Sequence, residues 1–377
     1  MKLAIIQDEL VRKGGAEQVV LSFQAAFPDA PIFTLSYNRE TTYPEFKNSK
    51  ISTPWFGKLI KDDVNLKRFF YPFGIWAMRS LDLSSYDVIL MSTTHCAKYV
   101  NVNRSALVIT YCHTPFRLVY RPNSYAEVAN SNFIKSFLYK FVINRLKNID
   151  QASAKRTDFF ITNAIGVIPR IEEAYHPINK VTVINPPVKV KKFYLSKTIE
   201  DYFLVVSRFE PYKKIDLVIE AFNQMPDKKL IIVGKGSLKA ELKKSAKDNI
   251  TFLEDVDSIR LGELYSKCKA LIFPQLEDYG ITPLEANASG RPVIAFGEGG
   301  VRDTMIPYAT GGSDTSTAIF FKPQSSIGLL QAVKLFENLK FNPQFIRKHA
   351  EKFDEDVFVV NVRDFVETKY KLHINGQ

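Results

Sequence analysis

Residues 274–296, PQLEDYGITPLEANASGRPVIAF, decide the fold of this chain, because they read as a strand end, a loop, a helix and a second strand. The preceding apolar run stops at Pro274, which has no N–H to continue a strand ladder. Gly280 permits a turn, and Thr282 is the predicted N-cap of a helix in which Glu285 completes a capping box. A strand, a helix and a strand in this order predict one unit of a parallel α/β sheet.

Two carboxylates belong to this unit, with Glu277 in the loop and Glu285 in the first turn of the predicted helix. Open α/β sheets bind ligands outside the carboxyl ends of their strands. We therefore predict that both side chains face a ligand site, together with the backbone amides of residues 280–284. The residues also leave open a plainer interpretation, in which Glu285 only caps the helix and Glu277 is a solvated loop charge.

Short apolar runs alternate with helical stretches along the chain, which predicts parallel sheets covered by helices on both faces. The predicted strands of the first half are residues 3–6, 32–35, 88–91, 106–112, 159–162 and 181–184. Those of the second half are residues 203–207, 230–233, 250–253, 270–273, 293–296 and 318–321. Two such sets predict two doubly wound α/β domains.

The predicted domain boundary lies in the sequence Asn-Pro-Pro-Val at residues 185–188, because consecutive prolines end a strand and stiffen a linker. The 377 residues then divide into domains at 1–187 and 188–354, each of the usual size for a single core. A last helix is predicted over residues 354–372.

The charge balance narrows the class of partner. With 51 Lys and Arg against 40 Asp and Glu, the formal charge of +11 favours a nucleic acid, an acidic membrane surface or a phosphorylated substrate. No nucleic-acid recognition motif is present, so nucleic acid is not an expected partner. Cys96, Cys112 and Cys268 are too scattered for a disulfide framework or a metal motif, which indicates a reduced, cytoplasmic protein. Neither a signal peptide nor a transmembrane helix is predicted.

A pair of cations follows the first predicted strand of the second half. Arg208 comes directly after that strand, and Lys213 comes five residues later, just before a predicted helix. A guanidinium fork and an ammonium group on one such loop can converge on a diphosphate. Solvated surface charge is the alternative, but the position in the same half as Glu277 and Glu285 favours a phosphate site.

Two places in the first half lie where a ligand can be reached. Gly14 and Gly15 open a predicted helix that runs to about Ala26, and a helix N-terminus suits a phosphate, although a plain turn is the alternative. His113 ends the strongest strand of this half, and Arg117 follows it. A histidine at the carboxyl edge of a sheet can reach a ligand, or it can be an ordinary core or surface residue.

Two further loops of the second half are candidates for a role. Gly299 and Gly300 belong to a glycine-rich turn before a predicted helix, where a plain tight turn is the alternative. Asp255 and Asp257 form a D-x-D sequence. We expect this acidic turn to cap the helix beginning at Ser258 rather than to bind a metal.

Basic and aromatic residues interleave at residues 54–81 and 133–147. The first stretch contains Trp55, Phe56, Phe69, Phe70, Tyr71 and Trp76 among Lys58, Lys61, Lys67 and Arg68. Such helices can lie on an anionic membrane surface, or they can be ordinary helices with one core face and one solvent face. Both interpretations stay open.

Several of these motifs resemble one known family. The spacing from Glu277 to Glu285, with Gly-Arg-Pro-Val at residues 290–293, resembles the E-x7-E and G-x-P-V elements of the retaining nucleotide-sugar glycosyltransferases of family 4. Tyr279 stands where Phe is usual. Residues 207–213 resemble that family's S-R-x-x-x-x-K motif, Cys-His-Thr-Pro at 112–115 resembles another of its elements, and the likeness covers nearly the whole chain.

The resemblance implies roles for individual residues. Glu285 would bond the nucleotide ribose, and Glu277 would bond hydroxyls of the donor sugar. Arg208 and Lys213 would hold the leaving diphosphate, and His113 would lie beside the donor sugar. The other implied contacts are Gly14, Gly15, Tyr279, Gly280, Ile281 and Thr282 for the donor, and Arg117, Gly299 and Gly300 for the sugar or acceptor.

This chain departs from the family pattern at the end of its first strand. The family often has His-Asp there, whereas this chain has Gln7-Asp8, so no histidine role is expected at that point. No metal or other cofactor is implied, because cationic side chains and helix N-termini can stabilise the leaving diphosphate.

The implied fold is GT-B, with two Rossmann-like, doubly wound domains facing a cleft and a C-terminal helix, about residues 355–377, crossing back to the first domain. The implied reaction is retaining transfer of a hexose, from GDP-mannose first or UDP-glucose next, to a growing bacterial surface saccharide such as O-antigen. A lipid-linked acceptor and peripheral contact with the inner face of the cell membrane would fit this reaction. The alternatives are a nucleotide-sugar epimerase of the same fold and a non-catalytic sugar-nucleotide-binding protein.

Overall fold

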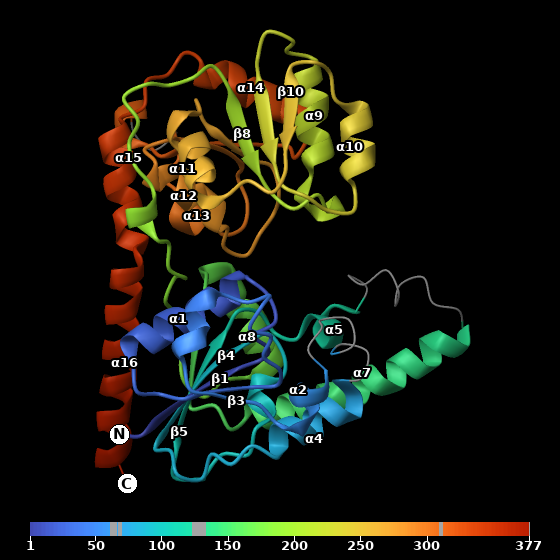
Figure 1. The fold of residues 1–377 in the computed structure, drawn as a ribbon, viewed down its shortest axis with the longest axis vertical. Coiled ribbons are helices and arrows are strands. Elements are labelled where there is room, and N and C mark those ends of the chain that lie inside the picture. Colours follow the sequence, from blue (N-terminus) through green and yellow to red (C-terminus); the bar gives the residue numbers. More distant parts are fainter. Residues whose placement is uncertain (61–65, 67–69, 123–132, 309–311, 377) are drawn as a thin grey trace. The chain divides into compact units, whose positions relative to one another are not determined.

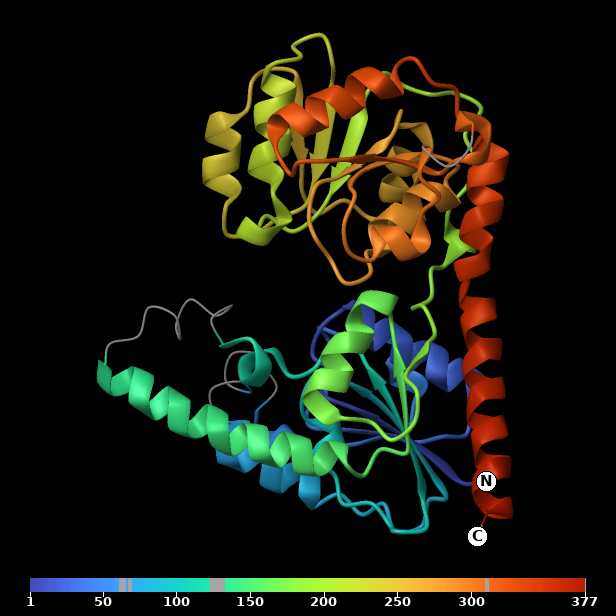
Figure 2. The ribbon, with the colours of Figure 1, turned by 180° about the vertical axis from the view of Figure 1, so that it is seen from behind.

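The computed structural model describes residues 1–60, 66, 70–122, 133–308 and 312–376. The chain forms two compact units, of which the first comprises Met1–Pro187 with Asp356–Gln377 and the second comprises Val188–Glu355. Each unit contains one parallel sheet with helices on both faces (Figure 1; Figure 2). The predicted fold class, two doubly wound α/β domains, is confirmed.

The first unit is built on a seven-stranded sheet in the order β3-β2-β1-β4-β5-β6-β7, and every pairing is parallel. The strands are β1 Leu3–Gln7, β2 Ile32–Thr34, β3 Ile51–Ser52, β4 Val88–Thr93, β5 Leu107–Cys112, β6 Phe159–Thr162 and β7 Thr182–Val183. Strand order runs outward in both directions from the boundary between β1 and β4. That boundary is the topological switch point, where doubly wound sheets bind ligands.

Strand β1 shows why this sheet is covered on both faces, because its side chains alternate between two buried clusters. Ala4 and Ile6 pack with residues of α4 and α7, whereas Leu3 and Ile5 pack with residues of α1 and α16. These helices are α1 Gly15–Ala26, α4 Ile75–Arg79, α7 Phe133–Ala154 and α16 Glu355–Asn375. A strand buried on both faces reads as a continuous apolar run, which is how β1 is recognised in the sequence.

The second unit is built on a six-stranded parallel sheet in the order β10-β9-β8-β11-β12-β13, with its switch point between β8 and β11. The strands are β8 Phe203–Val206, β9 Leu230–Val233, β10 Ile250–Leu253, β11 Leu271–Phe273, β12 Val293–Phe296 and β13 Ala318–Phe321. Helices α9 Ile215–Asn223, α10 Lys239–Ser245 and α14 Ser326–Phe336 pack together on one face. Helices α11 Ser258–Lys267, α12 Ile281–Ala288 and α15 Pro343–Ala350 pack together on the other (Figure 1).

Short helical segments complete the two units. In the first unit they are η1 Pro44–Asn48, α2 Trp55–Leu59, η2 Phe70–Gly74, η3 Ala97–Tyr99, α5 Arg117–Tyr120, η5 Ile165–Val167 and α8 Ile168–Tyr175. In the second they are η6 Val190–Lys192, η7 Pro211–Lys213, α13 Val301–Thr304, η9 Ser313–Thr315 and η10 Glu351–Phe353. The predicted strands end within two residues of the observed ones. Strand β3 was not predicted, because two residues are too few to show a strand pattern.

The basic aromatic stretches contain both buried and exposed rings. Phe56 and Phe70 belong to the core, whereas Trp55, Trp76 and Phe137 are exposed. Lys61, Lys67, Arg68 and Phe69 lie outside the described residues. Among the described residues, no helix combines the length and the apolar character needed to cross a membrane.

Candidate active site

The loops that follow β8 and β11 meet at the switch point of the second sheet. Lys213, the last residue of η7, forms an ion pair with the carboxylate of Glu277, which follows β11. Their side chains are only 12% and 24% exposed, so the pair is largely shielded from water. The structure thus brings the residue predicted to bind phosphate into direct contact with the residue predicted to bind sugar.

Arg208 belongs to the same loop and is linked to Lys213 through Tyr212. Nη2 of exposed Arg208 donates a hydrogen bond to the hydroxyl of Tyr212 at 2.6 Å. Nζ of Lys213 lies 5.0 Å from the centroid of the same ring, within the range of a cation–π contact. Sequence reasoning missed Tyr212, whose only signal is an aromatic ring directly before Lys213.

Glu285 is held by a different partner, and the predicted capping box is wrong. Gly280 adopts φ 88°, ψ 98° and occupies the N-cap position of helix α12, which begins at Ile281. Thr282 therefore lies inside the first turn. The carboxylate of Glu285 instead accepts a hydrogen bond from the hydroxyl of Tyr265 in α11 at 2.7 Å. Burial raises the pKa of Glu285, an effect that this hydrogen bond partly offsets.

The glycine-rich turn after β12 supports the loop that carries Glu277. The N–H of Gly300 donates to the carbonyl oxygen of Glu277 at 2.9 Å. A Cβ at Gly300 would lie 2.4 Å from Cα of Tyr279. A Cβ at Gly299 would lie 2.4 Å from the backbone carbonyl oxygen of Glu277. The two glycines let two loops pack backbone to backbone, and buried Tyr279 lies in that contact.

The D-x-D sequence of the second unit is engaged in local contacts. Asp257 caps α11 by accepting a hydrogen bond from the N–H of Arg260 at 2.8 Å, as predicted. Asp255 accepts a hydrogen bond from Nζ of Lys235 at 2.9 Å. Asp257 therefore serves the start of the helix, whereas Asp255 makes an exposed ion pair with Lys235.

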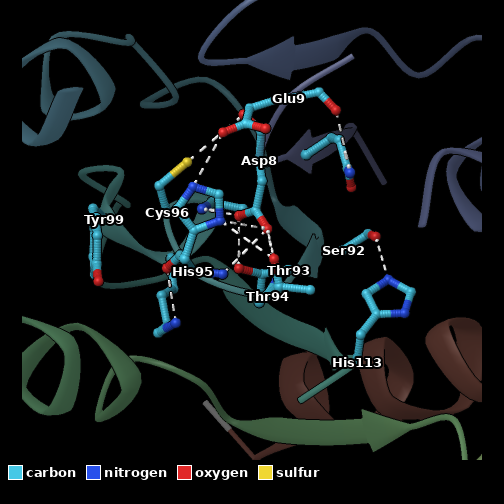
Figure 3. Close-up of polar contacts among 12 residues, drawn as sticks. Asp8, Glu9, Ser92, Thr93, Thr94, His95, Cys96, Tyr99 and His113 are labelled. Atoms are coloured by element: carbon cyan, nitrogen blue, oxygen red, sulfur yellow. Dashed lines mark hydrogen bonds and ion pairs between the residues drawn. The ribbon is translucent and has the colours of Figure 1, made fainter. Parts of the chain in front are cut away.

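A second constellation lies at the switch point of the first sheet, where β1 and β4 end (Figure 3). Asp8 follows β1 and is enclosed by the loop that follows β4. Its carboxylate accepts hydrogen bonds from the N–H groups of Thr94, His95 and Ala97 and from the hydroxyls of Thr93 and Thr94. Burial opposes its charge, but His95 and these donors hold the pKa of Asp8 well below its ordinary value.

His95 lies between two carboxylates. Its Nδ1 is 3.2 Å from Oδ2 of Asp8, and its Nε2 is 3.3 Å from Oε1 of Glu9. Burial disfavours the imidazolium, but the Cys96 sulfur and the Asp8 carboxylate outweigh it and raise the pKa of His95 well above its ordinary value. An imidazole thus does stand beside Asp8, although position 7 is glutamine. It comes from the β4 loop, and its only sequence signal is a histidine shortly after a strand.

The start of α1 contains an acidic side chain that the phosphate prediction did not consider. Gly14 is the N-cap of α1, and a Cβ there would lie 2.5 Å from Oε2 of Glu17. Burial raises the pKa of Glu17 to about 7. Nε of Arg12 lies 3.4 Å from Oε1 of Glu17. A carboxyl group therefore already occupies the space beside the predicted phosphate-binding turn at Gly14 and Gly15.

His113 lies at the end of β5, next to β4 on the same edge (Figure 3). Its Nε2 is 2.9 Å from Oγ of Ser92. Burial lowers the pKa of His113 to about 4, so this imidazole is neutral near pH 7 and can donate or accept a hydrogen bond. Arg117, the first residue of α5, is exposed.

Comparison with known families decides the class of the protein. Residues 189–357 match the family described as "Glycosyl transferases group 1". This segment is a group 1 glycosyltransferase domain. The matched segment contains Arg208, Lys213, Glu277 and Glu285, and it covers the second unit almost completely.

Curated relatives of this glycosyltransferase extend over both units. It is 23% identical to alpha-1,3/1,6-mannosyltransferase ALG2 of Saccharomyces cerevisiae, over 91% of this chain and 82% of the relative. It is 26% identical to O-antigen chain mannosyltransferase RfbU of Salmonella typhimurium, over 76% of this chain and 75% of the relative.

Solved structures share the GT-B fold of this glycosyltransferase. Sucrose-phosphate synthase from Thermosynechococcus elongatus superimposes with a TM-score of 0.73 at 16% identity, covering 99% of this chain and all of that one (100%). HepE of Anabaena in complex with UDP superimposes with a TM-score of 0.70 at 16% identity, covering 98% and 100%. At this identity the likeness shows the fold alone.

Proposed function

We propose that this glycosyltransferase moves mannose from GDP-mannose to a saccharide acceptor with retention of the anomeric configuration. The observation that carries the proposal is the shielded ion pair of Lys213 and Glu277 at the switch point of the second sheet. The names of its relatives support mannose as the sugar. UDP-glucose is the second candidate donor, since the structures that resemble this chain include HepE with UDP-glucose.

The side chains of the site suit the charges of such a reaction. As the bond from sugar to phosphate breaks, negative charge grows on the leaving diphosphate, and fixed cations stabilise it. We assign this task to Lys213 and Arg208, and we assign hydroxyls of the donor sugar to Glu277 and the nucleotide ribose to Glu285. His113, as a neutral imidazole, would hydrogen-bond to the sugar, and the leaving phosphate would take the acceptor proton.

We further propose that the reaction needs no metal ion. In the D-x-D sequence, Asp257 caps α11 and Asp255 pairs with Lys235. In the described part of the chain, Asp8, His95 and Cys96 are spaced closely enough to hold a metal. However, both oxygens of Asp8 already accept hydrogen bonds, so this group does not suit a metal.

A transfer assay tests the function and separates the alternatives. The protein would be incubated with GDP-mannose or UDP-glucose, with and without octyl α-mannoside, in EDTA. We expect GDP release and a longer glycoside by mass spectrometry only when the mannoside is present. Release from an epimerase would not depend on the glycoside, and a non-catalytic binder would release no nucleotide.

Replacement of Lys213 by alanine connects the activity to the site. We expect the rate of transfer to fall roughly 10²–10³-fold, which is typical for loss of one preformed charge-stabilising donor. Lys235→Ala, which removes an exposed lysine of the same unit, is the matched control. Near-full activity in Lys213→Ala would place the diphosphate elsewhere.

We also propose that the acceptor is lipid-linked and that the first unit contacts the inner face of the cell membrane. Exposed Trp55, Phe73 and Trp76 accompany basic residues, and α7 adds exposed Phe137 and Phe141. Amphipathic basic and aromatic surfaces bind anionic bilayers. We expect sedimentation with phosphatidylglycerol vesicles but not with phosphatidylcholine vesicles, and Trp76→Ser should weaken it. Tyr194→Ser, which removes an exposed ring of the second unit, is the control.

A further inference from the structure

Glu285, to which we assign the nucleotide ribose, is held at one carboxylate oxygen only. The hydroxyl of Tyr265 in α11 donates a hydrogen bond to Oε2 of Glu285 at 2.7 Å. In the part of the chain that the structure describes, no side chain or backbone group donates to Oε1. Glu285 itself is partly exposed on α12. Tyr265 therefore fixes one oxygen of this carboxylate and leaves the other to accept hydrogen bonds.

The ring of Tyr265 is fixed by its surroundings. Tyr265 is fully buried, and it meets the ring of Phe193 edge-on at 5.6 Å between centroids. The carbonyl oxygen of Phe193 in turn accepts a hydrogen bond from Nη1 of Arg347 at 2.9 Å. A side chain locked by such packing can hold a ligand-binding group in one orientation.

The chemistry of the contact favours a charged Glu285. Burial and the neighbouring carboxylate raise the pKa of Tyr265 well above its ordinary value, so its hydroxyl stays protonated and donates. Burial also raises the pKa of Glu285, whereas the Tyr265 hydrogen bond and the charge of Lys192 act in the opposite direction. An ionised carboxylate only accepts hydrogen bonds, which suits it to the hydroxyls of a ribose.

Holding the carboxylate in advance also favours binding. A glutamate side chain loses rotamer freedom when a ligand immobilises it, and this loss weakens the affinity. The contact between α11 and α12 restricts Glu285 already in the folded protein. A site built to bond a hydroxyl discriminates against an analogue that lacks the hydroxyl, because the polar group of the site is then left unpaired.

We propose that Tyr265 is a positioning residue, which holds Glu285 for the ribose hydroxyls and thereby makes the protein prefer a ribonucleotide to its dideoxy analogue. The proposal rests on the proposed function, because it uses the assignment of Glu285 to the ribose. Tyr265 contacts no ligand and acts through Glu285 alone.

Calorimetry with GDP and with 2′,3′-dideoxy-GDP tests the proposal. The wild-type protein should bind GDP about 10–100-fold more tightly than the dideoxy analogue, as for a hydrogen bond to a charged group. Tyr265→Phe, which removes only the hydroxyl, should weaken GDP binding by about 3–10-fold, as for loss of one hydrogen bond. Its affinity for 2′,3′-dideoxy-GDP should stay within about twofold of the wild-type value, because that ligand makes no use of Glu285.

Tyr202→Phe is the matched control. Tyr202 is also buried, and its hydroxyl donates to the carbonyl oxygen of Leu264 in the same helix at 2.9 Å. This substitution removes a buried hydroxyl that bonds to α11 without touching Glu285, so both affinities should stay unchanged. Thermal melts show that each variant is folded.

A double variant tests whether Tyr265 acts through Glu285. Glu285→Ala should abolish the preference for GDP over 2′,3′-dideoxy-GDP. Adding Tyr265→Phe to it should change the ratio of the two affinities no further, since coupled residues give non-additive effects. A further drop in that ratio would show that Tyr265 acts independently of Glu285, and it would contradict the proposal.

The binding measurements contain no sugar donor and no acceptor, so they separate this proposal from the proposed function. The expected affinities in a protein that transfers no sugar would support the role of Tyr265 and refute the transfer. Equal weakening of GDP and its dideoxy analogue in Tyr265→Phe would mean that the tyrosine serves the fold alone. That result, or unchanged GDP binding, would overturn the proposal. UDP and 2′,3′-dideoxy-UDP are measured in parallel, and a wild-type protein that prefers the ribonucleotide in neither pair would also overturn it.

Discussion

The ion pair between Lys213 and Glu277 joins two opposite charges that the proposed reaction needs separately. In the proposed reaction, the ammonium of Lys213 would bind the diphosphate, and the carboxylate of Glu277 would bind a sugar hydroxyl. Each ligand group must therefore compete with the partner side chain for its contact. Replacing one partner changes the affinity of the other for its part of the donor.

Glu277→Gln should separate nucleotide binding from transfer. We expect GDP to bind as tightly as to the wild-type protein or up to about tenfold more tightly, because Lys213 loses its competing anion. Transfer should fall, since glutamine holds a sugar hydroxyl less strongly than a carboxylate. Calorimetry with GDP and the transfer assay measure the two effects. Glu263→Gln, at a half-buried position of α11 that pairs with Lys267, is the control. Weaker GDP binding in Glu277→Gln alone would contradict this account.

Glu17 makes the stability of the first unit depend on pH. Its pKa is raised from 4.5 to about 7 by burial, so between these values the folded state binds a proton that the unfolded state has lost. The free energy of unfolding therefore falls as pH rises from about 4.5 to 7, by on the order of 3 kcal/mol.

Glu17→Gln should remove this dependence. Relative to the wild-type protein, the variant should gain stability between pH 5 and pH 8, by on the order of 2–3 kcal/mol. Urea unfolding followed by tryptophan fluorescence reports on the first unit, because Trp55 and Trp76, the two tryptophans of the chain, both belong to it. For Glu40→Gln, at an exposed loop position of the same unit, the difference in unfolding free energy from the wild-type protein should stay constant between pH 5 and pH 8. A constant difference for Glu17→Gln would refute the assignment of the pH dependence to Glu17.

At the scale of single residues, the sequence predicts contacts between side chains that follow neighbouring parallel strands. Lys213 and Glu277 are such a case, because β8 and β11 pair. The hydrogen bond from Tyr265 to Glu285 was not predictable, since it depends on how α11 packs on α12. His95 also escaped prediction, because the chain separates it from Asp8 by 87 positions and only the pairing of β1 with β4 brings them together.

At the scale of elements, the glycine-rich turn and the loop after β11 behave as one support for Glu277. Gly300→Ala would place a Cβ 2.4 Å from Cα of Tyr279, which forces two backbones apart. We expect a loss of about 1–3 kcal/mol in stability and weaker binding of GDP-mannose. The melting temperature and calorimetry check this result.

A second glycine provides the control for that substitution. A Cβ at Gly166, in η5 of the first unit, has nothing within 4 Å. Gly166→Ala should therefore leave both the stability and the donor affinity nearly unchanged. Equal effects of the two substitutions would mean that Gly300 supports nothing specific.

The elements themselves were largely predictable, because apolar runs of four or more residues between helical stretches mark buried parallel strands. The start of α12 was not. The sequence pattern of Thr282 and Glu285 is a valid capping box, but Gly280 takes a backbone conformation that starts the helix earlier. The path of the loop that carries Glu277, and not the capping preference of Thr282, determines where α12 begins.

At the scale of the whole molecule, the two sheets have corresponding strand orders, and each has an ion pair at its switch point. The first unit differs from the second because α16, a helix from the other end of the sequence, completes its core. Phe358 of α16 stacks on Phe23 at 6.1 Å between ring centroids and meets Tyr111 edge-on, also at 6.1 Å.

Phe358→Ala should destabilise the first unit by about 3–5 kcal/mol, because it leaves a cavity between α16, α1 and the sheet. Tryptophan fluorescence during urea unfolding measures this loss. Val360→Ala, at a position 51% exposed on the same helix, should cost less than about 0.5 kcal/mol. Similar costs for both substitutions would show that α16 is not part of that core.

Assembly of the first unit from Met1–Pro187 and Asp356–Gln377 has a consequence for protein synthesis. The amino-terminal segment emerges from the ribosome long before Phe358 is translated. Phe23 and Tyr111 therefore lack their contacts with Phe358 while the rest of the polypeptide is made. The Val188–Glu355 segment can complete its sheet on the nascent chain, but the first unit is completed only after α16 has been translated. Until then, that apolar face is open to chaperones and to aggregation.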